Sequence, residues 1–175
     1  TVPHEFICVC DKATSYRDYD QEVHLDQRLE RSDLTGWWNK LWLFSPEAFL
    51  PGTAVLYFDL DVLVIGSLDK IAEGAPGSYE LAILRDFYDP SGYNSSAMMW
   101  SAGVNDDIWH SFNKAGRPDI PGGDQEWIRR SKPKVALLQD AFPQTFVSFK
   151  ANCHPYPPKG TKVVHRNGKV LDFRR

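Results

Sequence analysis

Two aspartates separated by one residue, Asp59 and Asp61, interrupt the most apolar stretch of this 175-residue chain. The stretch, residues 55–65, reads as one buried strand with β-branched and aromatic residues on both sides of the pair. A buried carboxylate is costly unless it is paired or bound to a metal, and side chains two apart on a strand point the same way. We therefore expect the carboxylates to converge at the carboxyl end of the strand, as ligands of Mn²⁺ or Mg²⁺ with phosphate oxygens completing the shell.

A second interpretation treats the two aspartates as turn residues after a strand that ends at Phe58. The apolar run that follows at once, residues 62–65, argues against it, because a turn is not usually followed directly by a second apolar run. The single strand with a metal-binding pair is the interpretation that we adopt from the sequence.

Short strands and short helices alternate around this motif. The pattern predicts strands at 6–10, 22–25, 81–84, 96–100, 135–138, 146–149 and 162–164, and helices at 37–44, 68–72, 106–114 and 123–130. This alternation predicts an α/β, Rossmann-like fold with a mixed, mainly parallel sheet flanked by helices. No linker or repeat divides the sequence, so residues 1–175 read as a single domain.

Composition narrows the classes of partner. A net charge of -3 and a pI near 5.9 argue against a nucleic-acid partner, which needs a basic surface. No run approaches about eighteen apolar residues, so the sequence predicts no membrane span. The three cysteines fit neither a disulfide framework nor a four-ligand zinc site. We interpret them as buried thiols in a reducing compartment and expect a cytoplasmic protein.

Two classes of enzyme place Asp-x-Asp at the end of a strand. In a phosphatase of the haloacid dehalogenase type, Asp59 would be a covalent nucleophile. The motif here does not lie on a first strand, and it lacks the glycine that usually follows the second aspartate. The acidic pair that such an enzyme needs, Asp106 and Asp107, sits at a predicted helix start, where capping explains it.

The second class fits more of the chain. Five ordered segments resemble the glycogenin-like family 8 glycosyltransferases, which have the GT-A (nucleotide-diphospho-sugar transferase) fold with a DxD motif. They are the basic-residue–Leu segment at 37–46, the DxD strand and Gly-x-Leu at 55–69, the Asn-containing strand at 93–100, the Asp-Gln helix start at 123–128 and the closing Val-His segment at 162–169. Together these matches span residues 36 to 169, most of the chain.

The resemblance implies a metal-dependent transfer of a sugar from a UDP-sugar to an acceptor, with retention of the anomeric configuration. The acceptor would be a glycan, a lipid-linked glycan or a protein. The resemblance also implies that Asp59, Asp61 and His165 hold Mn²⁺ (or Mg²⁺) against the diphosphate. By itself His165 reads as a surface histidine near the C-terminus, but an imidazole beside two carboxylates favours Mn²⁺ over Mg²⁺.

The resemblance further implies catalytic and donor-binding residues. The catalytic ones are Asp86, which would gather the hydroxyls of the donor sugar, and Asp124 and Gln125, which would lie beside the anomeric carbon. The donor-binding ones are Lys40, Arg85, Asn94, Ser95, Gly168 and Lys169. Residue type alone allows simpler roles: a solvated helix position for Lys40, a turn for Asn94 and Ser95, and a helix cap for Asp124.

The chain departs from the family pattern in three places. No strand–helix unit for the nucleotide base precedes residue 1, so we expect a short bacterial or phage-type member that lacks this unit or covers the base in another way. Lys169 lies closer to His165 than the family's lysine does, and Ser96 stands where the family has a glycine. These departures leave two alternatives open: the phosphatase, and a nucleotide-sugar-binding domain without catalysis.

Overall fold

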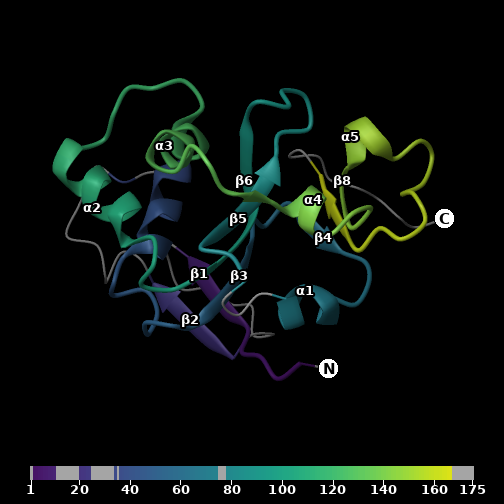
Figure 1. Ribbon diagram of the computed structural model, residues 1–175, viewed down its shortest axis with the longest axis horizontal. Coiled ribbons are helices and arrows are strands. Elements are labelled where there is room, and N and C mark those ends of the chain that lie inside the picture. The colour runs from purple at the N-terminus through teal and green to yellow at the C-terminus, as the bar shows by residue number, and fades with distance from the viewer. Residues whose placement is uncertain (1, 11–19, 25–33, 35, 75–77, 167–175) are drawn as a thin grey trace.

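The computed structural model describes residues 2–10, 20–24, 34, 36–74 and 78–166. Within these residues the strands form a parallel pair, β1 (Ile7–Cys10) with β2 (Gln21–His24), and two sheets. The central sheet has the order β3-β6-β5-β7, and a smaller sheet has the order β4-β9-β8 (Figure 1). The α/β class predicted from the alternating pattern is confirmed.

The central sheet is mixed. β3 (Ala54–Phe58), β5 (Leu81–Arg85) and β7 (Ala136–Leu137) run in one direction, and β6 (Tyr93–Ser101) runs against them between β3 and β5. Three of these four strands are therefore parallel in direction, but the pairings of β6 with both of its neighbours are antiparallel. Because β6 begins at Tyr93, the segment 93–95, which one interpretation read as a turn, belongs to the strand.

Both faces of the central sheet are buried, which explains the nearly continuous apolar character of its strands. Leu81 and Ile83 of β5 contribute to one hydrophobic cluster, while their neighbours Ala82 and Leu84 contribute to a second cluster on the opposite face. β6 alternates in the same way, with Met98 and Trp100 in the first cluster and Ala97 and Met99 in the second.

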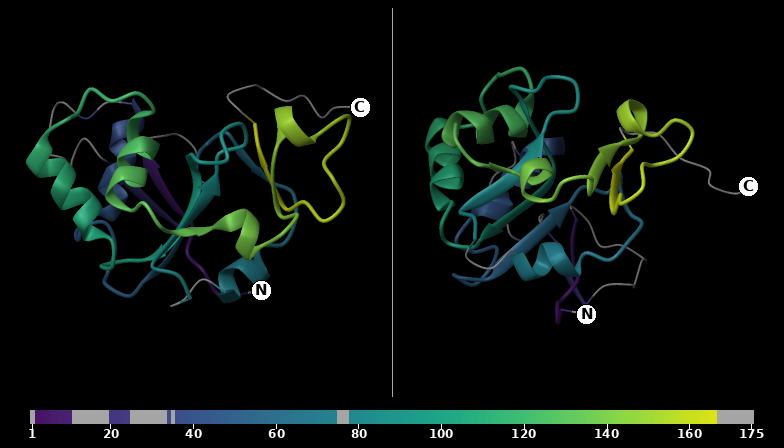
Figure 2. Two further views of the ribbon diagram at one scale, coloured as in Figure 1. Left: turned by 45° about the horizontal axis from the view of Figure 1, so that its top comes forward. Right: turned by 45° about the vertical axis from the view of Figure 1, so that its right-hand side comes forward.

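The first face is covered by the 3-10 helix η2 (Gly36–Phe44) and by the helices α2 (Asp106–Ala115) and α3 (Gly123–Ser131), which lie side by side in Figure 2. A 3-10 helix repeats every three residues, and Trp38, Leu41 and Phe44, which share one side of it, are all buried, as are Trp42 and Leu43 near its end. Trp38 stacks on Phe112 of α2 with ring centroids 5.3 Å apart. The predicted helix at 37–44 is confirmed.

The second face carries α1 (Asp69–Gly74), α4 (Leu138–Ala141) and the smaller sheet, made of β4 (Val62–Val64), β9 (Val163–His165) and β8 (Phe146–Ser148). A short helix, α5 (Phe149–Asn152), follows β8. None of the helices in the described ranges is long and apolar enough to cross a membrane.

The prediction of a single strand over 55–65 is wrong. β3 ends at Phe58 in the central sheet, and β4 begins at Val62 in the smaller sheet, where it pairs with β9. The backbone N–H of Val62 donates to the carbonyl of Asp59 at 3.0 Å, and Leu60 at the tip of this turn is 98% exposed. The second interpretation, a turn after a strand that ends at Phe58, is therefore correct about the backbone. The apolar run argued against it because such a pattern reports burial and not the partner of a strand.

Candidate functional site

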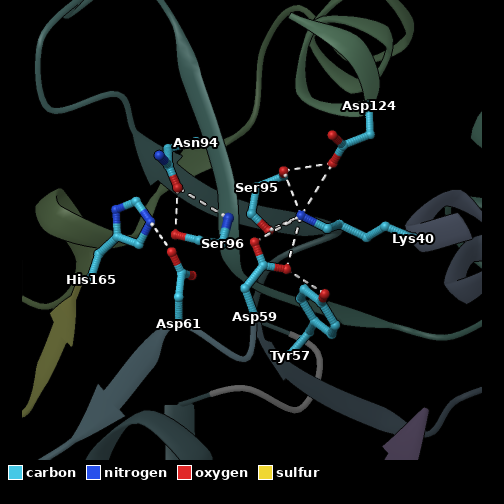
Figure 3. A network of polar contacts seen from close by, with 9 residues as sticks. All are labelled: Lys40, Tyr57, Asp59, Asp61, Asn94, Ser95, Ser96, Asp124 and His165. Carbon is cyan, nitrogen blue, oxygen red and sulfur yellow. Dashed lines mark hydrogen bonds and ion pairs between the residues drawn. The ribbon is translucent and has the colours of Figure 1, made fainter. Parts of the chain in front are cut away.

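Polar side chains from η2, β3, β6 and α3 meet at the carboxyl end of β3 (Figure 3). The ammonium of Lys40, whose side chain is only 9% exposed, lies 2.9 Å from the Asp59 carboxylate and 3.3 Å from that of Asp124. It also donates to Ser95 Oγ at 2.9 Å, and that hydroxyl donates to Asp124 Oδ2 at 2.6 Å. We call Lys40, Asp59, Ser95 and Asp124 the Lys40 cluster.

The geometry of the Lys40 cluster decides between two pairs of interpretations. Lys40 is buried between two carboxylates, so its interpretation as a solvated helix residue is wrong. Asp124 lies in the first turn of α3, but the N-cap position is held by Gly122 and no side-chain capping bond forms there. The carboxylate of Asp124 instead accepts from Ser95 and faces Lys40, so its interpretation as a cap is also wrong.

Tyr57 belongs to the same site, and the sequence analysis missed it. Its hydroxyl donates a short hydrogen bond to Asp59 Oδ1, and Lys40 Nζ lies 5.6 Å from the centroid of its ring. Burial first, and then the Asp59 carboxylate, raise the pKa of Tyr57 far above its ordinary value, so the phenol stays protonated and remains a donor. The sequence could have identified Tyr57, because it precedes Asp59 by two positions, and side chains two apart on a strand lie on the same face.

The second aspartate of the motif pairs with a histidine on the smaller sheet. The antiparallel register sets Val62 opposite His165, and His165 Nε2 lies 3.5 Å from Asp61 Oδ2. The imidazole is buried and stacks on Phe87 with ring centroids 6.0 Å apart, so the interpretation as a surface histidine is wrong. Burial lowers the pKa of His165 against the opposing pull of the Asp61 and Asp59 carboxylates, which favours the neutral, metal-binding form near neutral pH.

Asp59, Asp61 and His165 suit a divalent metal in their chemistry, since two carboxylates and a neutral imidazole are ligands that Mn²⁺ accepts. Two ligand atoms that each lie about 2.1 Å from an ion, with a right angle between the two bonds, are about 3 Å apart. The distance between His165 Nε2 and Asp61 Oδ2 is close to this, at 3.5 Å. Figure 3 shows Asp59 on the side of Lys40 and Asp61 on the side of His165. Among the residues that the structure describes, no three such side chains are close enough together to hold an ion as they stand. The ligand set therefore stays a prediction.

A pocket of about 300 Å³ lies beside the Lys40 cluster, between the loop that joins β5 to β6 and α3. It is lined by Asp86 and Gln125, two of the residues predicted to be catalytic, and Gln125 directly follows Asp124 of the cluster in the chain. Asp86 Oδ1 accepts from the backbone N–H groups of Tyr88 and Asp89, both at 2.8 Å, and so shapes the loop at the mouth of the pocket.

The alternation of β6 separates two predicted donor-binding residues. Ser95 points to Lys40, whereas Asn94 lies toward His165 and accepts from the backbone N–H of Ser96 at 3.0 Å (Figure 3). Ser96, in the place of the family's glycine, also donates its hydroxyl to the Asn94 amide oxygen. The side chain of Asn94 is thereby fixed beside the Asp61–His165 pair.

Not every predicted residue joins the site. The guanidinium of Arg85 pairs with Asp140 on α4 at 2.5 Å, and the Gln139 side chain bonds both the N–H and the carbonyl of Arg85. This contact between distant parts of the sequence directs Arg85 to α4 and away from the Lys40 cluster. Gly168 and Lys169 lie outside the described residues, so their predicted role is unchanged.

The fold resembles that of known glycosyltransferases. The glycosyltransferase GlyE of Streptococcus pneumoniae TIGR4 matches with a TM-score of 0.58 and 18% identity, over 83% of this chain and 40% of the GlyE chain. An active-site mutant of LgtC matches with a TM-score of 0.55 and 14% identity, over 86% of this chain and 68% of that one. The galactosyltransferase LgtC in complex with donor and acceptor sugar analogs gives a TM-score of 0.54 and 16% identity, over 85% and 67%.

Neither a scan against protein-family models nor a search of curated protein sequences found a match. The chain spans about two fifths of GlyE and about two thirds of LgtC. At these identities the likeness establishes the architecture and not the reaction. The described residues therefore have a glycosyltransferase fold of the GT-A type.

Proposed function

We propose that this chain carries the catalytic site of a metal-dependent glycosyltransferase that moves a sugar from a UDP-sugar to an acceptor hydroxyl with retention. The observation that carries the proposal is the meeting of the Lys40 cluster with the Asp61–His165 pair at the carboxyl end of β3. Open α/β sheets bind ligands at this edge. Support comes from the fold, which resembles GlyE, a glycosyltransferase, and LgtC, which was seen with donor and acceptor sugar analogs.

The residues divide the reaction between them. Asp59, Asp61 and His165 would hold Mn²⁺, which when bound neutralises the charge that develops on the departing diphosphate. The bond from the anomeric carbon to the β-phosphate oxygen breaks, with its electron pair going to UDP. A bond forms from the same carbon to the acceptor oxygen, and the proton of the acceptor hydroxyl passes to the oxygen of the departing diphosphate, from which it exchanges with water. Asp86 and Gln125 would orient the donor sugar in the pocket, with Asp124 beside them.

The phosphatase alternative fits the geometry less well. A nucleophilic carboxylate must present an unobstructed oxygen to phosphorus, but both oxygens of Asp59 contact the Lys40 ammonium, and one also accepts from Tyr57. The phosphatase would also need Asp107, at the start of α2, for its acidic pair. Asp107 instead forms an ion pair with Lys132. These contacts favour a role for Asp59 in binding over a role as a nucleophile.

Isothermal titration of UDP into the protein, with and without Mn²⁺, tests the proposal. We expect binding that depends on Mn²⁺, and we expect it to be at least about 100-fold weaker in Asp61→Ala, because a ligand is removed outright. Asp119→Ala, at an exposed position outside the site, is the matched control and should bind UDP like the unaltered protein.

Two further results would redirect the interpretation. Cleavage of p-nitrophenyl phosphate without metal-dependent UDP binding contradicts the proposal in favour of the phosphatase. Mn²⁺-dependent UDP binding without release of UDP from UDP-glucose, UDP-galactose or UDP-N-acetylglucosamine supports the non-catalytic binding domain.

Tyr57→Phe is expected to weaken Mn²⁺ binding by about 10-fold, because hydrogen bonds that fix a ligating carboxylate are typically worth 10- to 100-fold in metal affinity. The substitution removes only the hydroxyl that donates to Asp59, so the packing of the ring is kept. Electron paramagnetic resonance of free Mn²⁺ measures the affinity directly. Tyr156→Phe, at an exposed tyrosine, is the control, and an unchanged affinity in Tyr57→Phe would show that Tyr57 does not orient the ligand.

A further inference from the structure

An exposed tryptophan stands at the edge of the site. Trp37 is 62% exposed, whereas Trp38 and Trp109, which belong to the first hydrophobic cluster, are buried. In the 3-10 helix η2, Trp37 precedes Lys40 by one turn of three residues, so both side chains lie on the same side of the helix. Lys40, which places a cation in the site, is thus preceded by one helical turn by an exposed indole.

The indole is held in place although it is exposed. Gly123, the first residue of α3, has φ +58°, and a Cβ built on it would lie 2.2 Å from Trp37 Nε1 and 2.6 Å from Cδ1. The five-membered ring therefore packs directly over the Gly123 backbone, in the space where any other residue would have a side chain. One part of the indole is anchored on α3, and most of the rest is open to solvent.

The position of Gly123 indicates which part of the substrates Trp37 would contact. Gly122 lines the pocket and Gly123 contacts Trp37, and the next two residues, Asp124 and Gln125, belong to the Lys40 cluster and the pocket. Trp37 thus lies by the residues proposed to surround the anomeric carbon. In a UDP-sugar the base is separated from that carbon by the ribose and the diphosphate, and the diphosphate is assigned to the proposed metal site of Asp59, Asp61 and His165.

We infer that Trp37 is a platform on which the sugar ring of an acceptor glycan stacks. An indole face is apolar and electron-rich, and it binds the C–H face of a pyranose while the hydroxyls of the sugar remain free to bond polar groups. A sugar on this platform would direct its attacking hydroxyl toward the Lys40 cluster, next to the donor sugar that the pocket is proposed to hold. This inference rests on the proposed glycosyltransferase function and adds the class of acceptor and its binding residue.

The test uses the full chain labelled with 5-fluorotryptophan, whose ¹⁹F spectrum reports on the six tryptophans. The Trp37 resonance is assigned by its absence in Trp37→Phe. The probes are methyl α- and β-glycopyranosides of glucose, galactose and mannose, and, separately, UDP with Mn²⁺. We expect the Trp37 resonance to shift with at least one glycoside and not with UDP. Trp37→Ala should bind that glycoside at least about 5-fold more weakly, while Tyr156→Ala, at another exposed aromatic, should not.

The outcomes separate this inference from the function on which it rests. A Trp37 resonance that shifts with UDP alone assigns the indole to the nucleotide base and overturns the platform. A resonance that shifts with none of the probes overturns it as well, provided that UDP binding by calorimetry is intact. A failure of UDP to bind in calorimetry, with a glycoside response at Trp37, would instead contradict the proposed donor and leave the platform standing.

Discussion

Lys40→Met is expected to lower the free energy of unfolding by about 3 kcal/mol, at the low end of the range for removing one partner of a buried ion pair. The variant keeps the apolar stem of the side chain but leaves the Asp59 and Asp124 carboxylates facing each other without a cation. We choose the low end because the Asp59 side chain is 28% exposed, so water compensates part of the loss. Urea denaturation followed by circular dichroism measures the change.

A matched control is available in Lys132→Met. Lys132 also forms an ion pair, at 2.9 Å to Asp107, but the Asp107 side chain is 60% exposed, so the loss should stay below about 1 kcal/mol. Adding Asp124→Asn to Lys40→Met should restore part of the stability, since it removes one of the two opposed charges. Equal effects of Lys40→Met and Lys132→Met would contradict the view that the Lys40 cluster is a buried charge network.

Asp124→Asn is expected to slow the release of UDP from a UDP-sugar by about 100- to 1000-fold, the usual effect of removing one electrostatic group from a reacting centre. The amide still accepts the hydrogen bond from Ser95, and Lys40 keeps Asp59 as a partner, so the fold and the affinity for UDP should change little. A loss of turnover without a loss of UDP affinity is the signature of an interaction made in the transition state.

The measurement is a coupled assay of UDP release with Mn²⁺ and each of UDP-glucose, UDP-galactose and UDP-N-acetylglucosamine. Asp119→Asn, at an exposed position, serves as the control for a charge lost elsewhere. If Asp124→Asn turns over its donor like the unaltered protein, Asp124 is a partner of Lys40 and has no part in the reaction.

The sequence predicted local features of this site and not the contacts between distant segments. Asp59 and Asp61 were singled out because two carboxylates in an apolar run would be costly to bury, and the structure places them in the turn between β3 and β4. The break between β3 and β4 was considered, as a strand that ends at Phe58, but it was rejected, because it depends on which strand each segment pairs with. Arg85 was misplaced for a similar reason: its ion pair with Asp140 joins segments that nothing in the local pattern connects.

The burial of Lys40 likewise depends on contacts between distant segments. A lysine on a helix is ordinarily solvated, and only the meeting of η2 with β3 and α3 turns this one inward. The resemblance to a family selected Lys40 where composition and spacing could not. Tyr57 needed no long-range information, since strand alternation alone places it beside Asp59.

The division of the motif between two sheets sets an order for the assembly of the site during synthesis. β3, β6, β5 and β7 have all been made once the ribosome passes Leu137, so the central sheet and the Lys40 cluster can form on the nascent chain. β4 gains its partner β9 only when Val163–His165 emerges. The loop closed by this pairing is among the longest in the chain, so it forms late. A nascent chain therefore holds Asp59 in its final setting well before Asp61 meets His165, so the proposed metal site would stay incomplete until almost all of the described chain is outside the ribosome.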